Sequence, residues 1–332
     1  MPSLIQPAAV VVIGSGSWGT ALAVLLSRNG YAVRLWGVAS EIEYLHHHHR
    51  SLYLPEIKVP TNIELFSDLP AALKDVCDLV IAVPSFVFRD TLKLLKPHLA
   101  KNSRVFWGTK GLDPSDKFLH QVVAEELGDI PVAVLSGPTF AVEVAQGLPT
   151  AITVAANDHD FAQVVSNYLH GGNFRVYLSD DLIGVQICGA VKNVLAIAVG
   201  MSDGLGFGAN ARCALITRGL TEMLRLGQAL GGELKTFMGL AGLGDLVLTC
   251  TDDKSRNRRF GLAIGRGQNR MQAEKAIKQV VEGISNAQSV HLLAQNMRID
   301  MPIVEQVYGI LYENLSSQEA VNVLLSRTQK ME

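Results

Sequence analysis

One basic side chain stands inside a long apolar segment of the sequence. Between Asp181 and Gly200 the segment is apolar except at Gln186, Lys192 and Asn193. Burial disfavours the charged form of a lysine and lowers its pKa toward neutrality, as a group that exchanges a proton with a carbonyl or alcohol oxygen requires. A lysine that is only paired with an acid, or that extends along apolar surface, is the alternative. Position alone leaves both interpretations open.

A glycine-rich turn indicates a different chemistry. The sequence from Gly14 to Gly19 reads Gly-Ser-Gly-Ser-Trp-Gly, after a strand-like run and before a helix-like segment over 20–29. In this G-x-G-x-x-G pattern Gly14 permits a tight turn, Gly16 lets a pyrophosphate approach the backbone, and Gly19 lets helix meet strand. The first turn of the helix offers free N–H groups to the anion. We therefore predict a dinucleotide site here.

The residues after the second expected strand bear on the choice of dinucleotide. An NAD-specific site usually places Asp or Glu there to bind the ribose hydroxyls. This chain has Val38, and Glu41 comes late. The missing carboxylate removes a repulsive group against a 2′-phosphate, but no arginine selects that phosphate. The choice between NADH and NADPH stays open and leans to NADPH.

Two loops at the ends of expected strands, 108–111 and 136–141, look suited to a small anion. Ligands bind at the carboxyl edge of an open α/β sheet, where these loops should lie. Lys110 offers a charge, while backbone or hydroxyl groups come from Gly137, Thr139 and Ala141. An ordinary loop is the alternative for each.

A further candidate phosphate site lies in the C-terminal half, where Gly242-Leu243-Gly244-Asp245 precedes the segment 255–260. Ser255 is placed to cap a helix whose first turn carries Arg256 and Asn257. A cap, a guanidinium and an amide at a helix N-terminus form a phosphate cradle. A basic helix face against solvent is the alternative.

The elements that position these groups change in kind along the chain. Apolar, β-branched runs alternate with helical stretches at Ala8–Ile13, Ala32–Trp36, Leu79–Val83, Arg104–Trp107, Val132–Leu135, Ala151–Ala155 and Phe174–Tyr177. This rhythm predicts βαβ units in a mostly parallel, doubly wound sheet of the Rossmann type. After Asp181 the pattern is helical, at Asp181–Gly200, Asn210–Leu230, Arg256–Gly265, Ile284–Asn296, Ile303–Tyr312 and Gln318–Ser326. We expect an α/β dinucleotide-binding domain over 1–180 and an all-α substrate domain over 181–332.

Composition excludes several classes of protein. The 332 residues are 48% hydrophobic and 18% charged with a net charge of −2, which does not favour a nucleic-acid partner. The four cysteines form no C-x-x-C pair, so neither a metal site nor a disulfide framework is expected. No export signal or membrane span is recognisable, and we expect a cytoplasmic protein. The run His46–Arg50 is expected to be an exposed loop or helix end.

On these residues the sequence resembles the bacterial NAD(P)-dependent glycerol-3-phosphate dehydrogenases. The resemblance rests on Gly14–Gly19, Val83–Ser85, Gly108–Gly111, Ser136–Ala141, Gly189–Asn193, Met201–Arg212, Gly242–Thr251 and Ser255–Phe260. It implies reversible reduction of dihydroxyacetone phosphate to sn-glycerol 3-phosphate for glycerophospholipid synthesis. It also implies that the helical domain is like the C-terminal domain of 6-phosphogluconate dehydrogenase. Relatives are commonly homodimers.

The resemblance assigns roles to individual residues. Lys192 would be the general acid/base. Substrate-contacting positions would be Lys110, Gly137, Thr139, Lys192 and Asp245, with the phosphate on Ser255, Arg256 and Asn257. Cofactor-contacting positions, besides the three glycines, would be Ser17, Trp18, Lys110, Ala141, Arg256, Val280 and Glu282. No metal is implied.

Two features depart from the family, and two other functions compete. Where many relatives carry His or Arg this chain has Val38, and the run His46–Arg50 is unfamiliar. A related β-hydroxyacid or 6-phosphogluconate-type dehydrogenase is the alternative within the same enzyme class. A redox sensor that binds NAD(P) without chemistry is the alternative outside it, but a sensor needs neither Lys192 nor the segment 255–257.

Overall fold

The computed structural model describes residues 9–327, so Ala8 of the first expected strand lies outside it. The chain forms two compact units. The first contains residues 9–109 and 119–185, and the second contains residues 110–118 and 186–327. The short segment 110–118, which includes Lys110, thus belongs to the mainly helical unit.

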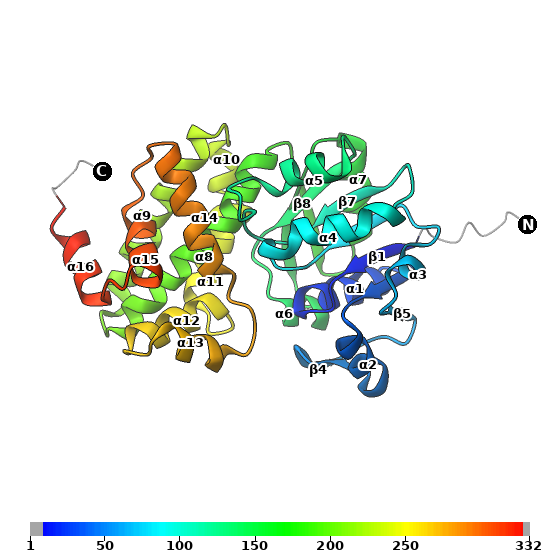
Figure 1. The fold of residues 1–332 in the computed structure, drawn as a ribbon, viewed down its shortest axis with the longest axis horizontal. Helices are drawn as coiled ribbons and strands as arrows, with labels where there is room; N and C mark the ends of the chain where they lie inside the picture. Colours follow the sequence, from blue (N-terminus) through cyan, green and yellow to red (C-terminus); the bar gives the residue numbers. More distant parts are fainter. Residues whose placement is uncertain (1–8, 328–332) are drawn as a thin grey trace, which may run out of the picture. The chain divides into compact units, whose positions relative to one another are not determined.

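The first unit is built on one eight-stranded sheet (Figure 1) with the order β10-β9-β8-β7-β6-β1-β2-β5. Its strands are β1 (Val10–Ile13), β2 (Val33–Trp36), β5 (Ile63–Phe66), β6 (Asp78–Ile81), β7 (Arg104–Trp107), β8 (Val132–Ser136), β9 (Thr150–Ala156) and β10 (Phe174–Ser179). All neighbours are parallel except β8 and β9. The predicted Rossmann-type sheet is confirmed.

Helices cover both faces of this sheet. They are α1 (Ser17–Arg28), α2 (Ala39–His48), α3 (Leu69–Leu73), α4 (Phe88–Leu95), α5 (Leu119–Leu127), α6 (Ala141–Gln146) and α7 (His159–Leu169), with short 3₁₀ turns η1 (Ser85–Val87) and η2 (Lys96–His98). Successive strand residues point to opposite faces. In β7, Phe106 contacts Phe161 of α7 with ring centroids 6.3 Å apart, and Trp107 contacts Phe88 of α4 at 5.7 Å. Because helices cover both faces of the sheet, the central strands are apolar at nearly every position.

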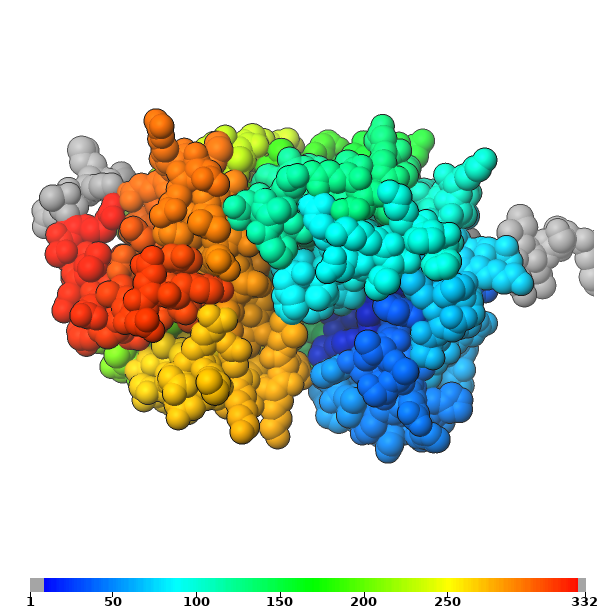
Figure 2. Space-filling view, viewed as in Figure 1, coloured from blue at the N-terminus to red at the C-terminus, as the bar shows by residue number. Residues whose placement is uncertain are grey.

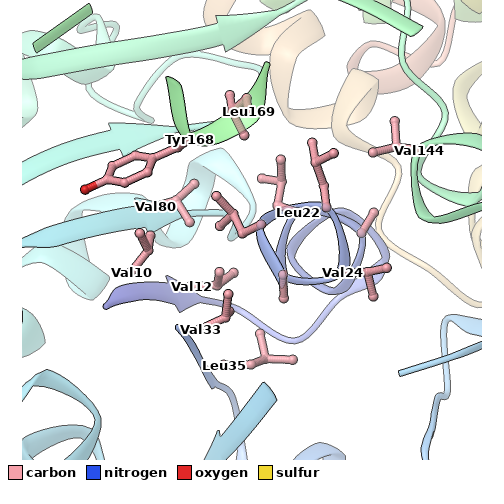
Figure 3. Close-up of a cluster of buried hydrophobic side chains, with 14 of the residues drawn as sticks. Val10, Val12, Leu22, Val24, Val33, Leu35, Val80, Val144, Tyr168 and Leu169 are labelled. Carbon is pink, nitrogen blue, oxygen red and sulfur yellow. The ribbon is translucent and has the colours of Figure 1, made fainter. Parts of the chain in front are cut away.

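The core beneath α1 fixes where the glycine-rich turn can lie. Figure 3 shows Leu22 of α1 close to the side chains of β1 and β2, among them Val12 and Val33. Val12 and Leu22 are fully buried. Because α1 is held against the strand that precedes it, the turn between them is fixed at both ends.

Three strands of the first unit were not predicted. β3 (Arg50–Ser51) and β4 (Leu54–Lys58) form a small antiparallel hairpin, and β5 joins the edge of the main sheet. All three are short and partly exposed, so they lack the buried apolar run that marked the central strands. His46 to Arg50 are exposed where α2 ends, as expected for this run.

The second unit contains no strand within the described residues. Its helices are α8 (Leu182–Gly204), which begins in the first unit, α9 (Gly208–Ala229), α10 (Leu234–Phe237), the π-helical turn η3 (Leu240–Gly244), α11 (Asp245–Thr251), α12 (Arg256–Gly265), α13 (Arg270–Ile277), α14 (Glu282–Asn296), α15 (Pro302–Tyr312) and α16 (Ser317–Leu325). The prediction missed α10, η3, α11 and α13. Figure 2 shows α16, in red, at the surface of this unit beside α15.

The long helix α8 is the core of the second unit. It is apolar and long enough to cross a membrane by length and composition, but 83% of its most apolar 18-residue window is buried inside the protein. Glycines let α12 approach α8 closely. A Cβ atom on Gly261 would lie 2.1 Å from the carbonyl oxygen of Ile197, and one on Gly200 would lie 2.1 Å from that of Arg258. This backbone contact packs α12 against the C-terminal half of α8.

We predict that Gly261→Ala lowers the free energy of unfolding by about 1–3 kcal/mol, the usual cost of forcing extra volume into a packed core. Urea denaturation measures this. The control is Arg259→Ala, an exposed position on the same helix, which should change stability by less than about 0.5 kcal/mol. Equal stability of the Gly261 variant and the parent would show that the helices are not held at this distance.

Candidate active site

The glycine-rich turn has the geometry that a pyrophosphate needs. Gly14 adopts φ +110°, and a Cβ on Gly19 would lie 1.8 Å from the carbonyl oxygen of Gly14, so both positions require glycine. A Cβ on Gly16 would meet no atom within 4 Å, which leaves open space over the turn. No side chain caps the start of α1, so its first N–H groups are available to an anion. The residues present therefore fit a dinucleotide.

Trp18 and Ser17 lie in the first turn of α1. The indole nitrogen of Trp18 is buried and has no hydrogen-bond partner among the described residues. Trp18 packs on Gly108, where a Cβ would lie 2.0 Å from the indole nitrogen. The Ser17 hydroxyl donates to the carbonyl of Tyr53 at 3.3 Å. The contacts of both residues with a cofactor remain predictions.

Glu41 contacts the glycine-rich turn, which the sequence analysis did not foresee. Its carboxylate accepts hydrogen bonds from the Ser15 hydroxyl and, at 2.6 Å, from the Tyr53 hydroxyl. The bond to Glu41 is the main reason why the pKa of Tyr53 rises to about 12. The helix α2 begins at Ala39, one residue after the exposed Val38. Glu41 is in the first helical turn of α2 and therefore lies next to the glycine-rich segment 14–19. The sequence analysis expected the carboxylate directly at the end of the second strand and therefore missed this contact of Glu41.

The loop after β8 contains three of the predicted contacts. Within it the Thr139 hydroxyl donates to the carbonyl of Gly137 at 3.1 Å, and Ala141 begins α6. This local bond fixes the loop. It does not test the predicted contacts of Gly137, Thr139 and Ala141 with substrate or cofactor.

In the second unit two lysines share one carboxylate. Lys192 of α8 donates to Oδ1 of Asp245 at 2.6 Å, and Lys110 donates to Oδ2 at 2.6 Å. Asp245 is 1% exposed and is the first residue of α11, directly after the π-helical turn η3. π-Helical turns occur frequently at functional sites. The structure thus joins three predicted site residues from three segments of the chain.

Burial and charge together set the protonation of Lys192. Desolvation is the main reason why the pKa of Lys192 is lowered to about 8; the neighbouring Lys110 contributes to this lowering, and the attraction of Asp245 opposes it. Lys192 is therefore paired with an acid and also has a lowered pKa, and its acid/base role stays a prediction. An amine with this pKa can gain or lose a proton near physiological pH.

Thr249 completes this cluster and was not singled out from the sequence. Its hydroxyl accepts a hydrogen bond from Lys192 at 2.9 Å and donates to the carbonyl of Asp245 at 2.6 Å. Thr249 follows Asp245 by four residues on α11, so both face the same side. This i,i+4 spacing is the signal that could have identified it.

The segment 255–257 lies at the N-terminus of α12. Ser255 caps the helix by accepting from the N–H of Arg258 at 3.2 Å. Asn257 donates to the side chain of Asn193 at 2.8 Å and accepts from the N–H of Gly283 at 2.9 Å. The amide of Asn257 therefore links α12 to α8 beside Lys192, a structural task that the sequence analysis did not anticipate.

Arg256 is the basic residue of the segment 255–257, and it differs from the nearby Arg258 in its contacts. Its neighbour Arg258 is paired with Asp203 at 2.6 Å. No hydrogen bond or salt bridge joins the Arg256 guanidinium to another described residue, and burial lowers its pKa while Glu282 opposes that effect. A partly buried, unpaired guanidinium at a helix N-terminus is suited to an anion. Glu282 begins α14, and Val280 is 39% exposed.

A groove of about 520 Å³ lies between α8, α9, α15 and α16 and contains none of the predicted site residues. Most of its lining is apolar. At its rim Asp300 pairs with Arg327 at 2.7 Å. We assign it no part in the chemistry. No group of metal-ligating side chains occurs in residues 9–327.

A Rossmann unit whose glycine-rich turn fits a dinucleotide, together with a buried lysine, is typical of a class of enzymes, the nicotinamide-dependent oxidoreductases. Comparison with models of protein families identifies one family within this class. Residues 9–162 match the N-terminus, and residues 181–322 the C-terminus, of NAD-dependent glycerol-3-phosphate dehydrogenase. The chain belongs to this family, and the resemblance noted in its sequence is confirmed.

Individual relatives agree over nearly the whole chain. Glycerol-3-phosphate dehydrogenase (NAD(P)+) of Pseudoalteromonas translucida is 54% identical over 329 residues, 98% of each chain. The crystal structure of the Coxiella burnetii enzyme superposes with a TM-score of 0.95 at 50% identity, covering 97% of this chain and 100% of that one. The structure of the glycerol-3-phosphate dehydrogenase of Saccharomyces cerevisiae superposes with a TM-score of 0.81 at 30% identity, covering 96% of this chain and 99% of that one.

Proposed function

We propose that this chain catalyses the reversible reduction of dihydroxyacetone phosphate to sn-glycerol 3-phosphate with NADH or NADPH. Family membership supports the reaction, and the observation that carries the mechanism is Lys192 bound to Asp245 with its pKa lowered to about 8. The product would enter glycerophospholipid synthesis. We further propose a cytoplasmic location and a homodimer, both on the resemblance alone.

Lys192 is the proposed proton carrier. Bound at the glycine-rich turn, the cofactor would supply a hydride to substrate C2 during reduction and take it back during oxidation. Protonated Lys192 then donates its proton to the developing alkoxide, and neutral Lys192 removes it again in the reverse direction. As a cation it also stabilises the negative charge on that oxygen. Asp245 and Thr249 hold the amine in place through the bonds described above.

Substrate selection rests on the start of α12. We propose that Arg256, the Ser255 hydroxyl and the first N–H groups of α12 bind the phosphate. Asn257 would support this arrangement through its bonds to Asn193 and Gly283. The remaining proposed substrate contacts are Lys110, Gly137, Thr139 and Asp245.

For the cofactor we propose use of both forms. Val38 is 56% exposed and offers neither a carboxylate to repel a 2′-phosphate nor a cation to bind it. Glu41 places a carboxylate at the turn, but two hydroxyl donors already bind it. The proposed cofactor contacts are Gly14, Gly16, Ser17, Trp18, Gly19, Lys110, Ala141, Arg256, Val280 and Glu282.

The proposed substrate is tested by comparing dihydroxyacetone phosphate with dihydroxyacetone, following the absorbance of NADPH and, separately, NADH. We expect turnover only with the phosphorylated ketone. Arg256→Met should lower kcat/KM about 10- to 100-fold, the value of one hydrogen-bonded charge. The control is Arg259→Met, an exposed cation on the same helix, which should stay near the parent rate. Equal rates with both ketones would contradict the phosphate site, whereas a preference for 3-hydroxy acids in competition with dihydroxyacetone phosphate would favour a related hydroxyacid dehydrogenase.

The proposed role of Lys192 predicts opposite pH dependences in the two directions. Oxidation requires the neutral amine, so kcat should rise with pH through about 8. Reduction requires the protonated amine, so kcat should fall through the same region. Lys192→Met should abolish both while dinucleotide binding, measured by calorimetry, stays close to that of the parent. Retained turnover in this variant would rule out the role, and cofactor binding without turnover in the parent would favour the redox sensor.

A further inference from the structure

A buried asparagine outside the predicted set holds Lys110 by its backbone. Asn286 lies in α14, one turn after Glu282, and is fully buried. Its amide nitrogen donates to the carbonyl oxygen of Lys110 at 3.2 Å. Lys110 is the first residue of the segment 110–118, which leaves the sheet unit and packs in the helical unit. Asn286 therefore fixes this segment at its first residue.

The chemistry of the amide explains its orientation and its cost. A carbonyl oxygen only accepts hydrogen bonds, so the nitrogen of Asn286 must face Lys110. The other amide atom, Oδ1, is then buried without a partner among the described residues. An unsatisfied buried acceptor is unfavourable, and a leucine of similar shape would avoid that penalty. The bond to Lys110 is the contact that a leucine could not make.

Lys110 is consequently held at two points. Asn286 fixes its backbone, and Asp245 binds its ammonium at 2.6 Å. The other oxygen of Asp245 binds Lys192, also at 2.6 Å. A displacement of the Lys110 backbone would change the charge that Asp245 and Lys192 experience.

We propose that Asn286 is a positioning residue for the dehydrogenase reaction, which sets where the Lys110 ammonium meets Asp245 and so the charge beside Lys192. The inference rests on the acid/base role proposed for Lys192. Asn286 acts only through Lys110.

The charges around Lys192 give the direction of the effect. The ionisable groups that act on it are Asp245 of α11 and Lys110, and the first raises its pKa while the second lowers it. The neighbouring Cys250 thiol has a pKa raised to about 12 by burial and stays neutral. Releasing Lys110 removes a repelling cation and frees Asp245 to act on Lys192 alone. Both changes favour protonated Lys192.

The test is the pH profile of glycerol 3-phosphate oxidation by Asn286→Leu. We expect its rising limb to move upward by about 0.5 to 1 pH unit, the size expected when one charge moves away in a medium of intermediate dielectric constant. At pH 7 this lowers kcat about 3- to 10-fold, while the KM for the cofactor changes little. The matched control is Gln306→Leu, another buried amide of this unit with an unpartnered oxygen, whose profile should match the parent.

A double variant separates positioning from a general loss of structure. If Asn286 acts through Lys110, Asn286→Leu should not shift the profile further in a Lys110→Met background. If Asn286→Leu does not unfold cooperatively, Asn286→Ser replaces it as the test variant, because the smaller serine cannot clash with its neighbours. The same shift of the pH profile is expected. An unmoved limb in a folded Asn286 variant, or an equal shift without Lys110, overturns the inference. A parent profile without a limb near pH 8 instead overturns the role of Lys192.

Discussion

Two lysines share one buried carboxylate in the helical unit, and the proposed chemistry depends on this arrangement. Asp245 favours the charged form of Lys192, and burial favours the neutral form. Burial is the largest influence and lowers the pKa of Lys192 to about 8 against the attraction of Asp245, and the repulsion from Lys110 acts in the same direction as burial. Removing Asp245 would leave two ammonium groups close together without their counter-charge, which is costly. The three side chains therefore act as one unit.

The helical unit brings this cluster together from segments far apart in the chain. Lys192 is on α8, Asp245 follows a π-helical turn, and Lys110 arrives on a segment that leaves the sheet unit. Glycines on α8 and α12 allow backbone contact, which brings Arg256 and Asn257 toward the lysine. The length and apolar character of α8 thus help to position the Lys192 amine, since a rigid buried helix fixes the side chains that it carries.

Much of the fold could be predicted from the sequence because its central elements are strongly patterned. The buried strands and long helices, the glycine-rich turn and the family were all predicted and are confirmed. The strands β3, β4 and β5 were missed because they are short and half exposed. The helices η3 and α11 were missed because glycines in the segment 239–244 read as a break.

Three residues of the cluster around Asp245 were named from the sequence, but their contacts with one another were not. Lys192, Lys110 and Asp245 were named, yet nothing in their spacing showed that one carboxylate binds both lysines. Glu41 was set aside on sequence distance, although the start of α2 brings it to Ser15. Thr249 and Asn286 carry no motif of their own, and only folding places them beside the lysines.

The most direct test of this account is the pKa of Lys192, measured by NMR titration of lysine Cε signals in the parent and in Asp245→Asn. Loss of one signal in Lys192→Met assigns the residue. We predict titration near pH 8 in the parent and at lower pH in Asp245→Asn, because the carboxylate favours the charged amine. Titration of Lys192 near the ordinary value of about 10.4, or at the same pH in both proteins, would contradict the account.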